Sequence, residues 1–356
     1  MKTKKVVSYL LLLALVFALP ACGNGSGSGS SPSESPNTQS GSAGSASAPA
    51  TTPQIILKMG TKMSEASLEG QGFQMFADLL EEKTDGAVKV QVYPSEQLGD
   101  ANTQINNLAM GTQELYAESG NYFSGFTNML EITNIPFLFQ SNEQYVELVQ
   151  GEYGKKQEAI LEENGFKILV SNRNWVRGPY RVICATKPIQ SIADIKGLRF
   201  RTHESDLYMK CWSTLGANPI VLNWSDVYLA IQQGTAAAVA SPVSMIEDMA
   251  FYEVAPYVTD ISEYPQEIII AMNLKVYESL TPEQQQACLD AANEAAEWSN
   301  SVLDQSVAES IARMEAAGAT FYKMDTAPCT EALIPYFREL EAQGTIPEGL
   351  LDTLGY

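Results

Sequence analysis

The segment that decides the fold runs from Arg181 to Pro242 and reads RVICATKPIQSIADIKGLRFRTHESDLYMKCWSTLGANPIVLNWSDVYLAIQQGTAAAVASP. Its short apolar runs predict strands at residues 181–184, 198–201, 219–222 and 236–240, with helices between them at residues 205–215 and 225–233. Strands that alternate with helices are typical of α/β architecture. The segment also holds Arg181 and Arg201 among apolar neighbours. Because guanidinium groups capture carboxylates in a bidentate fashion, it predicts a pocket for a small organic anion.

The alternation of strands and helices extends on the N-terminal side of this segment. Further strands are predicted at residues 55–60, 88–92, 114–117 and 166–171, and further helices at residues 69–83 and 103–110. The clearest helix comes later, where Thr281 is an N-cap, Pro282 takes the first helical position and Gln284 completes a capping box. It continues without proline or glycine to Gly318, which at 1.5 Å per residue is roughly 50 Å. We expect so long a helix to cross two domains or to bend at their junction.

The N-terminal residues predict export. Lysines precede an apolar run at residues 6–19, as in the charged and hydrophobic regions of a secretory signal peptide. The run is shorter than the roughly twenty apolar residues that a membrane span needs. It ends at Leu19-Pro20-Ala21-Cys22, which resembles a bacterial lipobox and predicts lipidation of Cys22. An ordinary signal peptide and an uncleaved anchor are the alternatives.

The rest of the chain divides by composition. Residues 23–53 consist almost entirely of Gly, Ser, Ala, Thr and Pro, which predicts a flexible tether. The predicted organisation is a signal peptide with lipobox at 1–22, the tether at 23–53, domain I at 54–178 plus about 267–306, and domain II at 179–266 plus about 307–356. We expect the body to lie outside the membrane, held by its lipid to the outer face of a bacterial cell membrane.

Composition also excludes several classes of function. The formal net charge is −20, which argues against nucleic acid and anionic lipid surfaces as partners. The chain has 1 histidine, His203, which argues against a His-based catalytic triad and against a zinc or iron site. Its position favours a structural hydrogen bond. No nucleophile–base pair, metal cluster or Gly-rich phosphate loop is recognisable, so the sequence predicts no enzyme activity, no metal and no cofactor.

The cysteines leave two possibilities open. With Cys22 assigned to lipidation, Cys184, Cys211, Cys288 and Cys329 remain, and an even number in an exported protein permits two disulfides. However, Cys184 lies in an apolar run and Cys211 stands beside a tryptophan. We therefore expect buried free thiols.

Several motifs, in this order and spacing, resemble one known family. They are residues 92–99 (VYPSEQLG), 135–139 (IPFLF), 196–201 (KGLRFR), 215–219 (LGANP), 225–234 (SDVYLAIQQG) and 279–285 (SLTPEQQ). Over nearly all of residues 55–356 the chain resembles the extracytoplasmic solute-binding proteins of tripartite ATP-independent periplasmic (TRAP) transporters, the DctP-like receptors. The resemblance implies a periplasmic-binding-protein-like, two-domain clamshell with crossing strands and one long connecting helix.

The resemblance also implies a mechanism and partners. A small carboxylated solute binds in the cleft, the domains close, and the receptor delivers it to integral-membrane permease subunits driven by an ion gradient. A sugar acid, a dicarboxylate, an aromatic acid and a sialic acid all remain open as ligands, and we expect a monomer. A receptor for an ABC importer and a ligand sensor for a signalling system are the alternative functions.

The resemblance assigns roles to individual residues. Arg201 matches the arginine that pairs with the ligand carboxylate, Arg181 a second pocket arginine, and Trp224 an aromatic wall. Glu118 matches a polar contact of the sialic-acid-binding branch, and Lys62 falls where another contact is common. Each also has a plainer interpretation, because the arginines could form structural ion pairs, Trp224 could be core, and the other two could be solvated.

One part of the chain departs from the family pattern. Members commonly carry an Asp-Gly-x-Glu-Asn-Pro-like motif where this chain has residues 237–242, AAVASP. Ser241 therefore replaces an asparagine that usually hydrogen-bonds the carboxylate. A serine hydroxyl can still donate one hydrogen bond, but its side chain is shorter and lacks the amide group.

Overall fold

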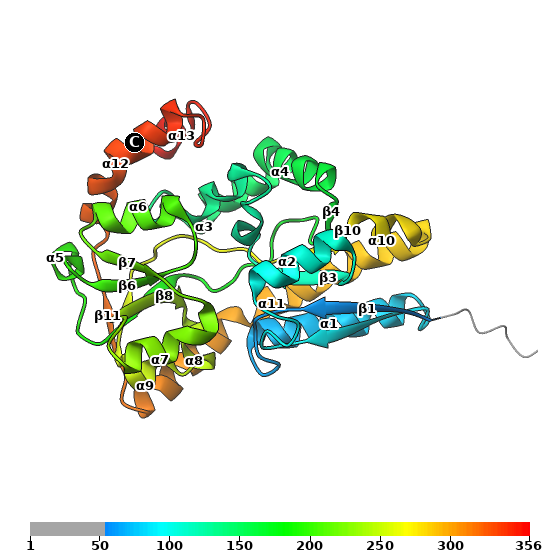
Figure 1. The fold of residues 1–356 in the computed structure, drawn as a ribbon, viewed down its shortest axis with the longest axis horizontal. Coiled ribbons are helices and arrows are strands. Elements are labelled where there is room, and N and C mark those ends of the chain that lie inside the picture. The colour runs from blue at the N-terminus through cyan, green and yellow to red at the C-terminus, as the bar shows by residue number, and fades with distance from the viewer. Residues whose placement is uncertain (1–53) are drawn as a thin grey trace, which may run out of the picture. The chain divides into compact units, whose positions relative to one another are not determined.

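Two β-sheets organise residues 54–356, the part of the chain that the computed structural model describes (Figure 1). The first sheet has the strand order β2-β1-β3-β10-β4 and the second has the order β11-β9-β5-β8-β6-β7. Both sheets mix parallel and antiparallel strands and are connected through helices, which confirms the predicted α/β class. Residues 1–53, with the predicted signal peptide, lipobox and tether, lie outside the described residues.

The first sheet takes strands from two distant parts of the chain. Its strands are β1 (Ile55–Gly60), β2 (Val88–Tyr93), β3 (Leu115–Glu118), β4 (Phe166–Ile168) and β10 (Ile269–Asn273). Strand β1 is parallel to β2 and β3, whereas β10 is antiparallel to β3 and β4. The accompanying helices are α1 (Leu68–Lys83), α2 (Ala101–Met110), α3 (Asn142–Gln150), α4 (Glu152–Glu163) and α10 (Leu274–Ser279). Short 3₁₀ turns η1 (Gly120–Phe123), η2 (Asn128–Leu130) and η3 (Ile132–Asn134) follow β3.

The second sheet is built mainly from residues 181–260, with one further strand from near the C-terminus. Its strands are β5 (Arg181–Ala185), β6 (Arg199–Thr202), β7 (Asn218–Val221), β8 (Ala238–Pro242), β9 (Tyr257–Asp260) and β11 (Thr320–Lys323). Strand β6 is parallel to β7 and β8, and β5 is antiparallel to β8 and β9. Its helices are α5 (Ile192–Ile195), α6 (Asp206–Thr214), α7 (Val227–Gln232), α8 (Val243–Asp248), α9 (Phe251–Val254), α12 (Ala327–Ala342) and α13 (Leu350–Leu354), with the turn η4 (Trp224–Asp226) before α7.

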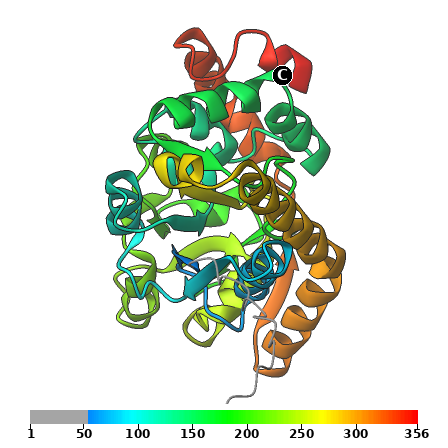
Figure 2. The ribbon, with the colours of Figure 1, turned by 90° about the vertical axis from the view of Figure 1, so that its right-hand side faces the viewer.

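The long helix α11 (Pro282–Ala316) runs along both sets of elements (Figure 2). It begins with the predicted capping box, in which the Gln284 amide N–H donates to the Thr281 hydroxyl over 3.3 Å and the Thr281 N–H donates to the Gln284 side chain over 3.0 Å. It contacts α1 beside the first sheet and α8 beside the second. Its buried stripe is rich in alanine (Ala287, Ala291, Ala292, Ala295, Ala296), whose small side chains let the neighbouring helix approach closely. The predicted helix spanning both parts is confirmed.

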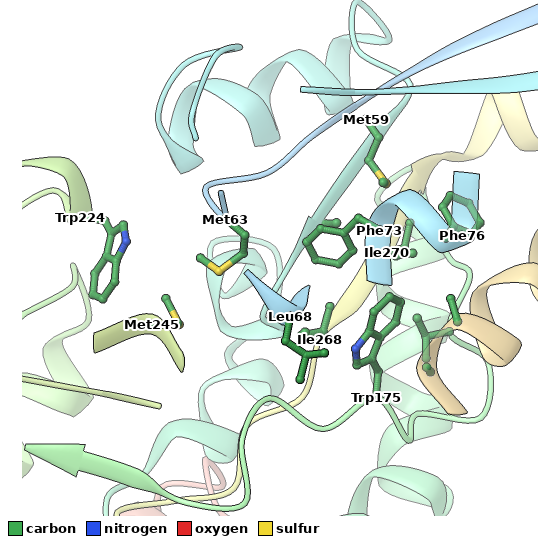
Figure 3. Close-up of a cluster of buried hydrophobic side chains, with 14 of the residues drawn as sticks. Met59, Met63, Leu68, Phe73, Phe76, Trp175, Trp224, Met245, Ile268 and Ile270 are labelled. Atoms are coloured by element: carbon green, nitrogen blue, oxygen red, sulfur yellow. The ribbon is translucent and has the colours of Figure 1, made fainter. Parts of the chain in front are cut away.

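Apolar packing between α1 and the neighbouring strands holds this region together (Figure 3). The rings of Phe73 and Trp175 lie 5.4 Å apart, centre to centre. A β-carbon at Gly72 would come within 2.6 Å of the Trp175 ring, so only glycine leaves room for this indole. On the second sheet the rings of Phe200 and Trp212 stack at 3.9 Å. Buried aromatic side chains thus pack against helices in both parts of the fold, and Phe200 lies on β6 next to Arg201.

Other expectations can be compared with the structure. Cys184, Cys211, Cys288 and Cys329 are buried and free, as the apolar surroundings of the first two predicted. The strands divide between two sheets, while the boundaries proposed for domains I and II stay a prediction. Among residues 54–356, no helix is both long and apolar enough to cross a membrane.

Candidate solute-binding site

A cavity of about 550 Å³ lies where loops of the two sheets meet. Its wall is formed by Lys62, Glu96, Asp100, Ala101, Asn102, Ile105, Asn106, Asn121, Tyr122, Ser124, Gly125, Phe126, Arg201, His203, Glu204, Val221, Leu222, Asn223 and Trp224. Most of these follow the carboxyl ends of β1, β2, β3, β6 and β7. In α/β proteins ligands bind outside the carboxyl ends of the strands, where polar loop residues converge. The fold therefore makes this cavity the candidate binding site.

Arg201 supplies the cavity with a positive charge that has no acidic partner in the described part of the chain. Strand β6 places the side chain in the wall, with 7% of the residue exposed. Its Nε and Nη2 donate to the Leu222 carbonyl over 3.1 and 2.8 Å. No carboxylate among residues 54–356 lies within ion-pair distance of it. Burial lowers the pKa of Arg201, and the nearby charge of Arg181 adds to this effect. A buried guanidinium without a counter-charge is costly, and a ligand carboxylate would compensate it.

Lys62 and Trp224 lie beside Arg201 in the wall. The Lys62 Nζ donates to the Tyr122 hydroxyl over 2.7 Å and lies 3.3 Å from Glu118 Oε2. The Trp224 ring centre is 5.4 Å from this Nζ and 5.3 Å from the Arg201 guanidinium carbon, within cation–π range of both. The indole N–H of Trp224 is buried and has no partner among the described residues. The structure thus brings three of the six predicted binding residues together at one cavity.

Glu118 lies beneath this wall. It is fully buried at the end of β3, forms ion pairs with Arg177 and Lys62, and is absent from the lining. Burial opposes its ionisation, but the charges of Arg177 and Lys62 hold the pKa of Glu118 below its usual range. Arg177 also lies 3.9 Å from Glu69 of α1. In this arrangement Glu118 fixes the position of the Lys62 ammonium.

Arg181 lies outside the lining and donates three hydrogen bonds within the protein. Its Nε donates to Glu263, its Nη1 to Gln266 and its Nη2 to the Ala240 carbonyl, each over 2.8 Å. Burial opposes its charge, yet Tyr264 and Glu263 beside it keep the pKa of Arg181 above its ordinary value. The plainer interpretation, a structural ion pair, therefore describes Arg181 in this conformation, with Glu263 supplied by the loop after β9.

Glu263 is held in turn by two other side chains. It is completely buried, and one of its oxygens accepts from the Tyr208 hydroxyl over 2.7 Å and from the Trp212 indole over 2.8 Å. In this Arg181 cluster, formed by Arg181, Glu263, Gln266, Tyr208 and Trp212, the charge of Arg181 is already paired with a protein carboxylate.

Ser241 also lies outside the lining. It is buried on β8, in register with Val182, and its hydroxyl contacts the Met245 sulfur at 3.4 Å. The asparagine position of the family pattern is thus occupied by a residue that bonds within its own neighbourhood.

His203 lines the cavity as a neutral, structural residue. Its ring stacks on Tyr208 at 4.8 Å and its Nε2 lies 3.3 Å from the Asn121 amide nitrogen. Burial, followed by the charges of Arg201, Arg181 and Lys62, lowers the pKa of His203 well below its ordinary value. Within residues 54–356, no group of three His, Cys, Asp or Glu side chains is placed to hold a metal.

Sequence reasoning missed part of the wall. Glu96, Asn121, Tyr122 and Asn223 line the cavity, and no periodic pattern marks them. Each lies in a polar loop or turn shortly after a strand, and Glu96 also belongs to the motif at residues 92–99; these are the signals that could have found them. Asn121 is 6% exposed, and its side-chain carbonyl oxygen is buried without a hydrogen-bond partner among the described residues.

These features define a binding protein of two-sheet α/β fold for a small anionic solute. The DctP family, described as "Bacterial extracellular solute-binding protein, family 7", matches residues 59–343, and the chain belongs to this family. It is a solute-binding protein and not an enzyme, as the sequence predicted, and the predicted likeness to DctP-type receptors of TRAP transporters is confirmed.

Known relatives share most of its length. The 2,3-diketo-L-gulonate-binding periplasmic protein YiaO of Escherichia coli is 26% identical over 82% of this chain and 88% of that protein. The C4-dicarboxylate-binding periplasmic protein DctP of Rhodobacter capsulatus is 26% identical over 82% of this chain and 88% of that protein. The structure of a TRAP periplasmic solute-binding protein of Roseobacter denitrificans with bound L-galactonate has a TM-score of 0.77 and 25% identity, covering 86% of this chain and 100% of that one.

Proposed function

We propose that this protein is an extracytoplasmic receptor that binds a small organic carboxylate and delivers it to the integral-membrane subunits of a TRAP-type transporter. The observation that carries the proposal is the Arg201 guanidinium, buried in the cavity wall without a carboxylate partner among the described residues. The relatives support it, since the names of two of them give a keto sugar acid and a C4-dicarboxylate as the ligand, and the structure of a third holds a sugar acid.

The ligand contacts follow from the lining. Arg201 binds the carboxylate, Trp224 packs against the carbon chain, and Lys62 contributes a second positive charge in the position that Glu118 gives it. A carboxylate loses hydration when the site encloses it, and charge-assisted hydrogen bonds restore that loss. Direct ligand contact by Arg181, Glu118 and Ser241 stays a prediction, because in this conformation the three lie outside the lining of the cavity.

The attachment of the receptor is part of the proposal. Lipidation of Cys22 and a tether at residues 23–53 would hold the body at the outer face of the cell membrane, beside the permease, while leaving it free to close on its ligand. We expect a monomer without cofactor or metal.

The test is a thermal-shift and calorimetric screen of the purified protein against organic acids. A ligand at about one hundred times its dissociation constant stabilises the folded state by about 2.7 kcal/mol, which gives a shift of several degrees. We expect one class of carboxylate to produce it. Failure of every carboxylate to shift or bind folded protein would contradict the proposal.

Substitution of Arg201 then tests the site itself. Arg201→Ala should weaken binding by about 3–5 kcal/mol, on the order of a hundred- to several-thousandfold. Arg201→Lys should also bind poorly, because a point charge does not reproduce the fork. Arg199→Ala is the matched control, since Arg199 lies on the same strand with its side chain exposed. Near-normal affinity in Arg201→Ala would remove Arg201 from the site.

A further inference from the structure

The cavity wall contains acidic as well as basic side chains. Lys62 and Arg201 are its cations, while Glu96, Asp100 and Glu204 are its acids. A site built for a dianion would be expected to carry an excess of positive charge, since a second ligand carboxylate also has to be neutralised when it leaves water. This wall instead offers one unpaired guanidinium and several hydrogen-bond acceptors.

Glu96 is placed in the wall by a strained turn. Ser95 and Glu96, between β2 and α2, have φ angles of 52° and 59°, in the left-handed region that non-glycine residues rarely adopt. The turn is held because the Ser95 N–H donates to the Met63 carbonyl over 2.9 Å and the Glu96 N–H donates to the Thr61 carbonyl over 3.0 Å. Both carbonyls flank Lys62. Strain that the surroundings maintain in this way is characteristic of functional sites.

The Glu96 carboxylate is available to a ligand. Among residues 54–356 it makes no ion pair within 4.0 Å, although Lys62 and the Ser225 hydroxyl lie near enough to favour its charge. Burial raises the pKa of Glu96. Asp100 is less available, because one of its oxygens accepts from the Thr103 N–H at the start of α2.

Two further polar groups in the wall lack partners. The carbonyl oxygen of Asn121 and the indole N–H of Trp224 are both buried and unbonded among the described residues, and each belongs to a residue that is 6% exposed. Buried polar groups are nearly always hydrogen-bonded in complete sites. One acceptor and one donor beside a free carboxylate match the hydroxyl groups of a polyol chain, which donate and accept.

We infer that Glu96 makes the site selective for hydroxylated monocarboxylates over dicarboxylates of the same length, by accepting hydrogen bonds from ligand hydroxyls and repelling a second carboxylate. This inference rests on the proposed function, because it places the first carboxylate at Arg201. Arg201 belongs to the second sheet and Glu96 to a loop of the first, so a ligand carboxylate at Arg201 leaves the rest of the ligand to extend toward the side of the cavity that carries Glu96.

The test compares acids that differ at one carbon. Galactonate and galactarate, gluconate and glucarate, and threonate and tartrate are pairs in which the terminal CH₂OH of the first becomes a carboxylate in the second. Titration calorimetry on the wild-type protein should show at least one aldonate binding about tenfold or more tighter than its diacid, as expected when a buried like-charge contact is avoided.

Variants assign the preference to Glu96. Glu96→Gln removes the charge and keeps a carbonyl acceptor, so the preference should fall about tenfold or more, mainly because the diacid binds better. Glu96→Asp keeps the charge and tolerates the left-handed backbone, so it should retain the preference. Glu65→Gln is the control, since Glu65 is exposed on the neighbouring loop and the substitution changes net charge equally. Unfolding curves of the free variants show whether each is folded.

The outcomes separate the two proposals. Equal or tighter diacid binding by the wild type, an unchanged preference in folded Glu96→Gln, or no binding of any aldonate would overturn the selectivity inference. The first two results leave the carboxylate receptor standing. Absence of binding across the wider carboxylate screen would overturn the receptor itself.

Discussion

Arg201 and Arg181 are two buried arginines on neighbouring parts of one sheet, and they differ in what surrounds them. Arg181 donates hydrogen bonds to Glu263, Gln266 and a backbone carbonyl. Among residues 54–356, Arg201 donates hydrogen bonds only to the Leu222 carbonyl, and it lines the cavity. The role of each arginine therefore depends on whether a protein carboxylate lies beside it. A buried guanidinium paired with a protein carboxylate stabilises the fold, whereas one without such a carboxylate can bind the carboxylate of a ligand.

Replacing Arg181 tests most strongly whether the two arginines have different roles. Arg181→Ala leaves Glu263 buried with an uncompensated charge, so the unfolding free energy should fall by about 3–5 kcal/mol. Arg201→Ala removes a buried charge that has no carboxylate partner among the residues that the structure describes, so it should leave stability nearly unchanged. Urea unfolding of the two ligand-free variants measures both. Equal losses of stability would contradict the assignment of separate roles.

Lys62 combines the two situations, because it pairs with the buried Glu118 and also lines the cavity. Lys62→Met keeps much of the side-chain volume but removes a charged hydrogen-bond donor, so ligand affinity should fall by about 1.5–3 kcal/mol. Lys58→Met on β1 is the control, because that lysine is half-exposed, lies outside the cavity lining and donates to the Thr112 carbonyl. Calorimetric titration should show the loss only at Lys62, and unchanged affinity there would exclude it from the site.

His203 offers the smallest effect and the most specific readout. Its folded pKa lies below its unfolded value, because burial and the charges of Arg201, Arg181 and Lys62 disfavour the imidazolium. Between the two values the unfolded chain binds more protons, so stability falls as pH drops through about 6.5. The contribution is at most about 1.4 kcal/mol per pH unit.

His203→Gln supplies the comparison, since glutamine does not titrate and can still reach Asn121. Denaturant unfolding of both proteins between pH 7 and 5 should show a shallower loss of stability in the variant. Because the chain has 1 histidine, no other imidazole contributes to the difference. Parallel pH dependences would show that the wall does not destabilise the charged ring.

Much of the fold could be predicted from local pattern. Strand β1 and the start of α11 follow from alternation and from a capping box, which are short-range signals. Strand β10 was missed because Ile268–Ile270 is a continuous apolar run, and such runs fit a strand or a buried helix equally. Its pairing with β3 joins residues far apart in the chain, so no local pattern reports it.

The binding site, like the fold, could be predicted from the sequence only in part, because some of its contacts join residues far apart in the chain. Arg201, Lys62 and Trp224 were placed in it through the family resemblance, and they do line the cavity. The role of Arg181 depends on Glu263, which lies 82 residues further along the chain, and sequence pattern cannot pair the two. Glu96 reaches the wall through left-handed backbone that propensity does not favour.

A crystal structure of the protein with its bound carboxylate tests the central claim most directly. We predict that the carboxylate oxygens accept hydrogen bonds from the Arg201 guanidinium beside Trp224, while the Arg181–Glu263 pair stays intact. A carboxylate bound to Arg181 with Glu263 displaced, or a ligand that leaves Arg201 without a carboxylate contact, would contradict it.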